Sequence, residues 1–289
     1  MLLHFADERD YAARLATAAG LSPALIERHR FPDGELKLRL PTPLPARVVL
    51  LRSLHHPNEK LVELLMAARA ARELGALHLT LVAPYLAYMR QDMAFAPGEA
   101  VSQRIVGSWL AELFDAVVTI DPHLHRVGSL RDAVPADAAI ALTAAPFIGA
   151  AYRGANVLML GPDAEAEPWV RAAATAAGCT AAICRTERRG DRDVAVALPD
   201  ALLMGRHVVI VDDVASTGHT LAAVTRQALA GGAQRVDVAV THALMVGDAA
   251  QALRAAGVGE LISTDTVPHP SNRIGTADLV ASALRALPR

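Results

Sequence analysis

Two adjacent carboxylates, Asp212 and Asp213, follow an apolar run and precede a loop of small and hydroxyl residues: Val208-Val209-Ile210-Val211-Asp212-Asp213-Val214-Ala215-Ser216-Thr217-Gly218-His219-Thr220. This pattern predicts a strand that ends in two acids, followed by a loop that opens a helix. Backbone N–H groups at a helix N-terminus suit a phosphate dianion, and paired carboxylates accept hydrogen bonds from a sugar diol. A purely structural role, capping the helix, would need only one acid. We therefore expect a phosphate at Ser216, Thr217, Gly218 and Thr220.

The elements that must position these residues are those of an α/β protein. Short runs rich in Val, Ile and Leu alternate with Ala-rich amphipathic segments, which is typical of parallel strands joined by crossover helices. The clearest strands are expected at Val48–Leu51, Leu79–Ala83, Ala116–Ile120, Val157–Leu160, Val208–Val211, Val236–Val240 and Leu261–Ser263. We predict parallel sheets flanked by helices.

The chain also repeats one βαβ pattern. Val48–Leu51 leads through a helical segment to Gly75-Ala76 and a strand, and Val208–Val211 leads in the same way to Gly232-Ala233 and a strand. Each Gly-Ala pair fits the end of a helix that turns into the next strand. With 289 residues, two domains are expected, which we place at 1–142 and 143–289.

Composition narrows the function classes. A net charge of −2 leaves no excess positive charge for binding nucleic acid. The chain begins with acidic residues and has no apolar run of about 18 residues, so we expect a cytoplasmic protein that does not enter membranes. Cys179 and Cys184 are expected to be buried and reduced. The only lysines are Lys37 and Lys60, so cationic sites must rely on arginine.

The acidic loop resembles the phosphoribosyl-pyrophosphate-binding loop that type I phosphoribosyltransferases share with ribose-phosphate diphosphokinases. Further segments resemble the diphosphokinases: Arg30–Glu35, Pro84–Asp92, Asp121-Pro122-His123, Gly161-Pro162-Asp163, Thr241–Leu244 and Asp265–Ile274. The resemblance runs in order from Phe31 to Ile274. Ser216 stands where many members have an acidic residue, and a serine there looks like the archaeal-type subgroup.

The resemblance implies two tandem phosphoribosyltransferase-type, Rossmann-like domains, an N-terminal one on the ATP side and a C-terminal one that binds ribose 5-phosphate. The implied reaction transfers the diphosphoryl group of ATP to the 1-hydroxyl of ribose 5-phosphate, giving phosphoribosyl pyrophosphate and AMP. It also implies a homo-oligomer, at least a dimer, because the adenine site is often shared between subunits. The implied ATP-binding residues are Phe31, Asp33, Glu35, Arg90, Gln91 and Asp92. Mg²⁺ is implied at Asp121, His123 and Asp163, and Asp212 and Asp213 are implied to orient the ribose for catalysis.

The family's catalytic lid departs from the pattern in this chain. An ungapped alignment through Gly190-Asp191-Arg192 places Thr186 at the family's lysine and Arg188 at its arginine. Arg185 and Arg188 are therefore the candidate catalytic cations.

Two alternatives stay open at this point. One is a non-catalytic or regulatory paralogue that binds nucleotide and phosphoribosyl ligands. The other, less favoured, is a phosphoribosyltransferase, which would have no reason to keep Phe31–Glu35 and Arg90–Asp92. The presence of all the implied metal-binding side chains favours an enzyme.

Overall fold

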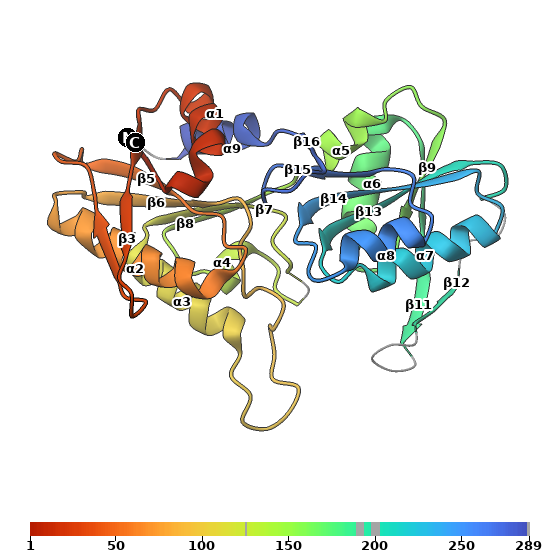
Figure 1. Cartoon of the computed structure of the whole chain (residues 1–289), viewed down its shortest axis with the longest axis horizontal. Coiled ribbons are helices and arrows are strands. Elements are labelled where there is room, and N and C mark those ends of the chain that lie inside the picture. Colours follow the sequence, from red (N-terminus) through yellow and green to blue (C-terminus); the bar gives the residue numbers. More distant parts are fainter. Residues whose placement is uncertain (125, 189–193, 198–202, 288–289) are drawn as a thin grey trace. The chain divides into compact units, whose positions relative to one another are not determined.

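A computed structural model describes residues 1–124, 126–188, 194–197 and 203–287, with the backbone alone at 185–188 and 194–197. The chain forms two compact units (Figure 1), Met1–Leu142 with Thr276–Arg289, and Thr143–Gly275. The observed second unit thus ends earlier than the domain 143–289 expected from the sequence. The reason is the amphipathic helix α9 (Ala277–Ala286), which packs against α1 (Arg9–Ala19) of the first unit; there Arg285 donates a hydrogen bond to the Ala18 carbonyl (2.7 Å).

The first unit is built on one parallel six-stranded sheet in the order β2-β1-β5-β6-β7-β8. Its strands are β1 (Leu2–His4), β2 (Pro23–Leu25), β5 (Arg47–Leu51), β6 (His78–Ala83), β7 (Ala116–Ile120) and β8 (Ala138–Leu142). Helices α1 and α9 lie on one side of this sheet; on the other lie α2 (Pro57–Glu73), α3 (Ser102–Leu113) and the short α4 (Leu130–Ala133) (Figure 1). A 3-10 helix, η1 (Ala6–Glu8), follows β1, and β3 (Glu27–Arg30) and β4 (Leu36–Arg39) form a separate antiparallel hairpin.

The second unit repeats this design with the strand order β10-β9-β13-β14-β15-β16, again all parallel. Its strands are β9 (Val157–Gly161), β10 (Thr180–Ile183), β13 (His207–Ala215), β14 (Arg235–Ala243), β15 (Leu261–Thr264) and β16 (Asn272–Ile274). Two helices cover each face: α5 (Ala145–Ala151) and α6 (Glu167–Ala177) on one, α7 (His219–Ala230) and α8 (Ala249–Ala255) on the other. A short antiparallel pair, β11 (Arg185–Arg188) with β12 (Val194–Ala197), extends from this unit.

The internal repeat predicted from the sequence is present. In the first sheet β1 lies between β2 and β5, and in the second sheet β9 lies between β10 and β13. The order of the strands therefore reverses direction between β1 and β5, and between β9 and β13. The two Gly-Ala pairs also match. Gly75 (φ 99°) and Gly232 (φ 92°) adopt left-handed backbone just after α2 and α7, and the next residue's N–H, at Ala76 and Ala233, bonds a carbonyl five residues back (3.0 Å in both).

Continuous apolar runs form the strands because both faces of each sheet are covered. On β13, Val208 and Ile210 pack toward α7 and α8, whereas Val209 and Val211 pack toward α5 and α6. All seven strands expected from such runs are present. The edge strands β2, β8, β10 and β16 were not among them, and each is mostly only partly buried or exposed. The buried inner strand β1 was not among them either, because three residues are too short to give a pattern.

Two smaller expectations need adjustment. β13 does not end before the two acids but continues through them to Ala215, paired with β14. Cys184 is buried as expected, whereas Cys179 is only partly buried; both thiols are free. Among the helices of the described chain, none is long and apolar enough to cross a membrane.

Candidate active site

Three carboxylates gather where the connections of the second unit reverse direction. Asp163 follows β9, and Asp212 and Asp213 lie on β13, its sheet neighbour. The carboxyl ends of parallel strands at such a reversal form the usual ligand-binding edge of an α/β sheet. One Asp163 oxygen accepts hydrogen bonds from the N–H groups of Glu165 (3.0 Å) and Ala166 (3.2 Å), which fixes this carboxylate at the start of α6.

The electrostatics of this group fit a bound cation. Burial, together with the neighbouring charges of Asp213 and Asp163, raises the pKa of Asp212 well above its ordinary range. Asp213 is itself only 2% exposed. Within the described residues, no three His, Cys, Asp or Glu side chains are close enough to hold an ion alone. Mg²⁺ commonly takes only one or two protein carboxylates and completes its shell with water and substrate phosphates, so this donor set is suitable for it.

The predicted phosphate loop lies between β13 and α7. Helix α7 begins at His219, and the residue before it, Gly218, has φ 73°, a left-handed conformation that favours glycine. No side chain caps this helix, so its first N–H groups are available to an anion. Thr217 is exposed, and Ser216 and Thr220 are partly buried. The structure therefore places Ser216, Thr217 and Gly218 in one loop at the carboxyl end of β13, and Thr220 in the first turn of α7.

The three side chains of Arg90–Asp92 do not all point to solvent as a set of phosphate ligands would. Asp92 has a side chain only 1% exposed, and it forms an ion pair with Arg126 (2.7 Å). Gln91 accepts a hydrogen bond from the hydroxyl of Ser102 (3.0 Å), the first residue of α3, so Gln91 supports the start of this helix. Arg90 alone of the three is exposed. Arg126 was missed, because nothing local links it to a partner 34 residues away.

Asp121 and His123 follow β7 directly, at the carboxyl end of the first sheet. Asp121 is 4% exposed and adopts φ 39°, an uncommon left-handed backbone for a non-glycine residue, while its N–H donates to the Leu142 carbonyl (2.8 Å). His123 is partly buried. Strained backbone of this kind often occurs where a side chain is held for function.

Residues 31–35 form the tight turn of the β3–β4 hairpin. The Phe31 N–H donates to the Glu35 carbonyl (2.8 Å), the Gly34 N–H donates to the Phe31 carbonyl (2.9 Å), and an Asp33 oxygen accepts from the Glu35 N–H (3.1 Å). Phe31 is 38% exposed, and Asp33 and Glu35 are also exposed. The turn therefore presents an aromatic side chain and two carboxylates to solvent.

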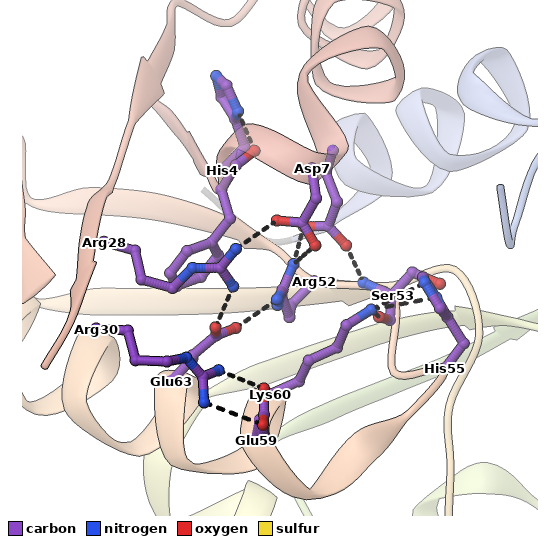
Figure 2. A network of polar contacts seen from close by, with 12 residues as sticks. His4, Asp7, Arg28, Arg30, Arg52, Ser53, His55, Glu59, Lys60 and Glu63 are labelled. Atoms are coloured by element: carbon purple, nitrogen blue, oxygen red, sulfur yellow. Dashed lines mark hydrogen bonds and ion pairs between the residues drawn. The ribbon is translucent and has the colours of Figure 1, made fainter. Parts of the chain in front are cut away.

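The corresponding edge of the first unit, between β1 and β5, is occupied by its own charges. Arg52, at the end of β5 and 1% exposed, forms ion pairs with Asp7 (2.8 Å), Glu8 (3.4 Å) and Glu63. Figure 2 shows Arg52 between Asp7 and Glu63, with Lys60 nearby. The Lys60 ammonium donates to the Ser53 carbonyl (2.6 Å). The acidic and basic side chains at this edge of the first unit therefore neutralise one another, whereas the edge of the second unit is acidic.

The candidate lid residues lie on β11. Arg185 is paired with Ala197 and Arg188 with Val194, so the described backbone places both arginines on an antiparallel arm. Residues 189–193, including Gly190-Asp191-Arg192, lie outside the described residues. The roles of Arg185 and Arg188 therefore remain predictions.

The last two segments singled out in the sequence come together at the ends of β14 and β15. His242 Nδ1 lies 2.8 Å from the Thr266 hydroxyl, and the hydroxyls of Thr264 and Thr266 donate to the Thr241 carbonyl (2.7 and 2.9 Å). All four residues are at most 1% exposed. Their hydrogen bonds fix the two strand ends beside the acidic edge.

Comparisons with known proteins agree with this architecture. Residues 1–113 match the family model described as the N-terminal domain of ribose phosphate pyrophosphokinase, and residues 130–254 match the phosphoribosyl transferase domain. A solved structure of phosphoribosylpyrophosphate synthetase from Mycobacterium smegmatis has the same fold, with a TM-score of 0.83, 23% identity, and coverage of 99% of this chain and 97% of that one.

Curated relatives are closer in sequence. The ribose-phosphate pyrophosphokinase of Methanopyrus kandleri is 35% identical over 277 residues, which cover 95% of this chain and 94% of the relative. Ribose-phosphate pyrophosphokinase 2 of Archaeoglobus fulgidus is 35% identical over 270 residues, covering 93% and 94%. Both are archaeal proteins, as the serine in the phosphate loop suggested. With this identity over nearly the whole length, the chain belongs to the ribose-phosphate pyrophosphokinase family.

Proposed function

We propose that this protein transfers the diphosphoryl group of ATP to the 1-hydroxyl of ribose 5-phosphate. The 1-oxygen forms a bond to the β-phosphorus, the bond from that phosphorus to the α,β-bridging oxygen breaks, and the hydroxyl proton leaves to solvent. The products are phosphoribosyl pyrophosphate and AMP. The observation that best supports this reaction is the acidic edge of the second unit beside a phosphate loop, within a chain whose relatives are ribose-phosphate pyrophosphokinases.

In the second unit, the loop Ser216–Thr220 would bind the 5-phosphate through its N–H groups and hydroxyls. Asp212 and Asp213 would hold ribose hydroxyls so that the 1-oxygen points at the β-phosphorus. Little covalent help is needed for such a transfer, because positioning and neutralisation of phosphate charge provide most of the rate enhancement. Asp163, with one oxygen already fixed by backbone N–H groups, would keep its other oxygen for a cation.

In the first unit, the turn Phe31–Glu35 would bind adenine and Arg90 would bind ATP phosphates. Gln91 and Asp92 are proposed to act mainly by holding that segment, since the Gln91 carbonyl oxygen accepts from Ser102 and Asp92 pairs with Arg126.

We propose Mg²⁺ as the cofactor, with Asp121 and His123 as its ligands in the first unit and Asp163 as a ligand in the second unit. When bound, it would neutralise phosphate oxygens of ATP. Support comes from the burial and the strained backbone of Asp121, and from the Asp163 carboxylate that backbone N–H groups hold in place.

Two further features of the protein are proposed. The exposed turn Phe31–Glu35 favours a homo-oligomer, at least a dimer, in which a second copy completes the adenine site. The free thiols Cys179 and Cys184 favour the cytoplasm.

The test is an assay of purified protein with ATP, Mg²⁺ and ribose 5-phosphate, in which AMP and phosphoribosyl pyrophosphate are measured by mass. We expect equal amounts of both products. Turnover should be largely lost in Arg185→Ala, because Arg185 is proposed to replace the lid lysine, and in Arg188→Ala, because Arg188 stands at the position of the family's lid arginine. Arg153→Ala is the matched control, since Arg153 is exposed and precedes β9, at the amino ends of the strands and thus opposite the acidic edge of the second sheet. Nucleotide binding without either product would refute the enzyme and leave the regulatory paralogue.

A further inference from the structure

The β3–β4 hairpin, which displays Phe31, is not part of the six-stranded sheet. Within the described chain its two strands pair only with each other. Its register sets Arg28 opposite Leu38 and Arg30 opposite Leu36. Because side chains alternate between the faces of a strand, these four residues share one face. The hydrogen bonds of the main sheet reach only the base of the hairpin, where the Ile26 N–H donates to the His4 carbonyl (2.8 Å), so contacts of this inner face must orient the rest of the hairpin.

Two ion pairs join the inner face to α2. Arg28 pairs with Glu63, and Arg30 forms a two-pronged contact with Glu59 (2.6 and 3.2 Å). The spacing of the two pairs matches: four residues of a helix rise about 6 Å, and two residues of a strand rise about 6.6 Å. The inner face of the hairpin thus fits the acidic face of α2 in one register (Figure 2).

The pair nearer the sheet, Arg28 with Glu63, belongs to a buried network of ion pairs. Glu63 is fully buried and also pairs with Arg52, which is held by Asp7 and Glu8 at the end of β1. The other pair, Arg30 with Glu59, has side chains 48% and 65% exposed and lies directly before the turn that starts at Phe31. One anchor therefore fixes the hairpin to the sheet, and the second sets the direction of its tip.

On the outer face, Phe31 contacts residues that point away from α2. Its ring lies edge-on to His29, with 4.8 Å between centroids, and the Lys37 ammonium lies 5.9 Å from the ring centroid. Neither contact involves α2, so the orientation of Phe31 depends on how the hairpin itself is held.

We infer that Arg28 and Arg30, through Glu63 and Glu59, are positioning residues for ATP: they hold the Phe31–Glu35 turn in its nucleotide-binding orientation without touching the nucleotide. The inference rests on the proposed function, in which this turn binds adenine. It assigns a role in ATP binding to a buried charge network that would otherwise serve stability alone.

The test uses the exposed pair, because its substitution leaves the buried network intact. Arg30→Glu and Glu59→Arg each place like charges together, and the double variant Arg30→Glu with Glu59→Arg restores the attraction. We expect each single variant to raise KM for ATP by about fivefold, the upper range for an exposed ion pair. The KM for ribose 5-phosphate and kcat should not change, and the double variant should recover most of the loss.

Arg39→Glu is the matched control, because Arg39 pairs with Glu27 (3.5 Å) inside the same hairpin and makes the same charge change without involving α2. It should leave KM for ATP unchanged. An unchanged KM for ATP in Arg30→Glu, or a double variant no better than the single ones, would overturn the inference. If the wild-type protein forms no AMP, the proposed reaction is rejected. Calorimetric ATP dissociation constants for the same variants then test whether Arg30 and Glu59 position the ATP-binding turn.

Discussion

Glu8 provides a quantitative test of the buried charge network in the first unit. It is 6% exposed, and it accepts a hydrogen bond from the Ser53 N–H (2.5 Å). Burial raises its pKa from 4.5 to about 7, against the lowering effects of Arg52, the Ser53 N–H and Lys60. The folded state therefore binds the Glu8 proton more tightly than the unfolded chain does.

The sign and size of the effect follow from this pKa. The stability contributed by protonated Glu8 is fully present below about pH 4.5 and is lost as pH rises through about 7. At about 1.4 kcal/mol per pH unit, the free energy of unfolding of the first unit should fall by about 3 kcal/mol across this range. Lys60 acts in the opposite sense above it: burial, followed by the charge of Arg52, lowers its pKa to about 8, so stability returns as pH rises from there.

The perturbation is Glu8→Gln, which keeps an oxygen for the Ser53 N–H and removes the titration. The assay is urea unfolding followed by the fluorescence of Trp109, on α3 of the first unit, in a Trp169→Phe background that silences the second unit. Between about pH 4.5 and about pH 7, wild-type stability should fall relative to the variant by about 3 kcal/mol.

The control is Glu59→Gln. The Glu59 pKa is lowered by its hydrogen bond with Arg30 and by the charge of that arginine, so this carboxyl titrates below the window. Parallel pH profiles for wild type and Glu8→Gln would refute the reasoning, since they would mean that Glu8 is not desolvated in the folded protein.

Arg126→Ala should lower the free energy of unfolding by only about 1 kcal/mol, because Arg126 is 55% exposed and solvent screens its ion pair with Asp92. It should also increase cleavage of loop 90–101 in limited proteolysis, and unchanged cleavage would show that this ion pair does not hold the loop. Gly149→Ala should destabilise the second unit by about 1–3 kcal/mol, because a Cβ there would lie 2.0 Å from the Ala173 carbonyl oxygen. Urea unfolding followed by Trp169 fluorescence measures this change, and a variant as stable as wild type would contradict the close approach of α5 and α6. Asp212→Asn should raise the melting temperature without Mg²⁺, because it removes a carboxyl that the folded protein must either protonate or keep charged beside Asp213 and Asp163, while Mg²⁺ should stabilise wild type more than the variant. Equal Mg²⁺ responses in thermal scans would argue against a cation at this edge.

The sequence alone determined most of the inner strands and the loop between β13 and α7. Residues such as Val208–Val211 were expected to form a strand buried on both faces, because a short, β-branched apolar run followed by a polar, glycine-containing loop favours a buried parallel strand over a helix. The repeat was also readable, since Gly75 and Gly232 mark the same left-handed turn after equivalent helices. These features depend on neighbours along the chain.

Only the tertiary structure decided the features that depend on distant partners. Asp92 pairs with Arg126, Glu63 with Arg28 and Arg52, and α9 packs against α1 at the other end of the chain. No local pattern distinguishes these arginines from the others in a chain with 26 arginines and two lysines. An ion pair forms where the fold brings two charges together and excludes water, so its partners are fixed by packing and not by the types of the residues that flank them.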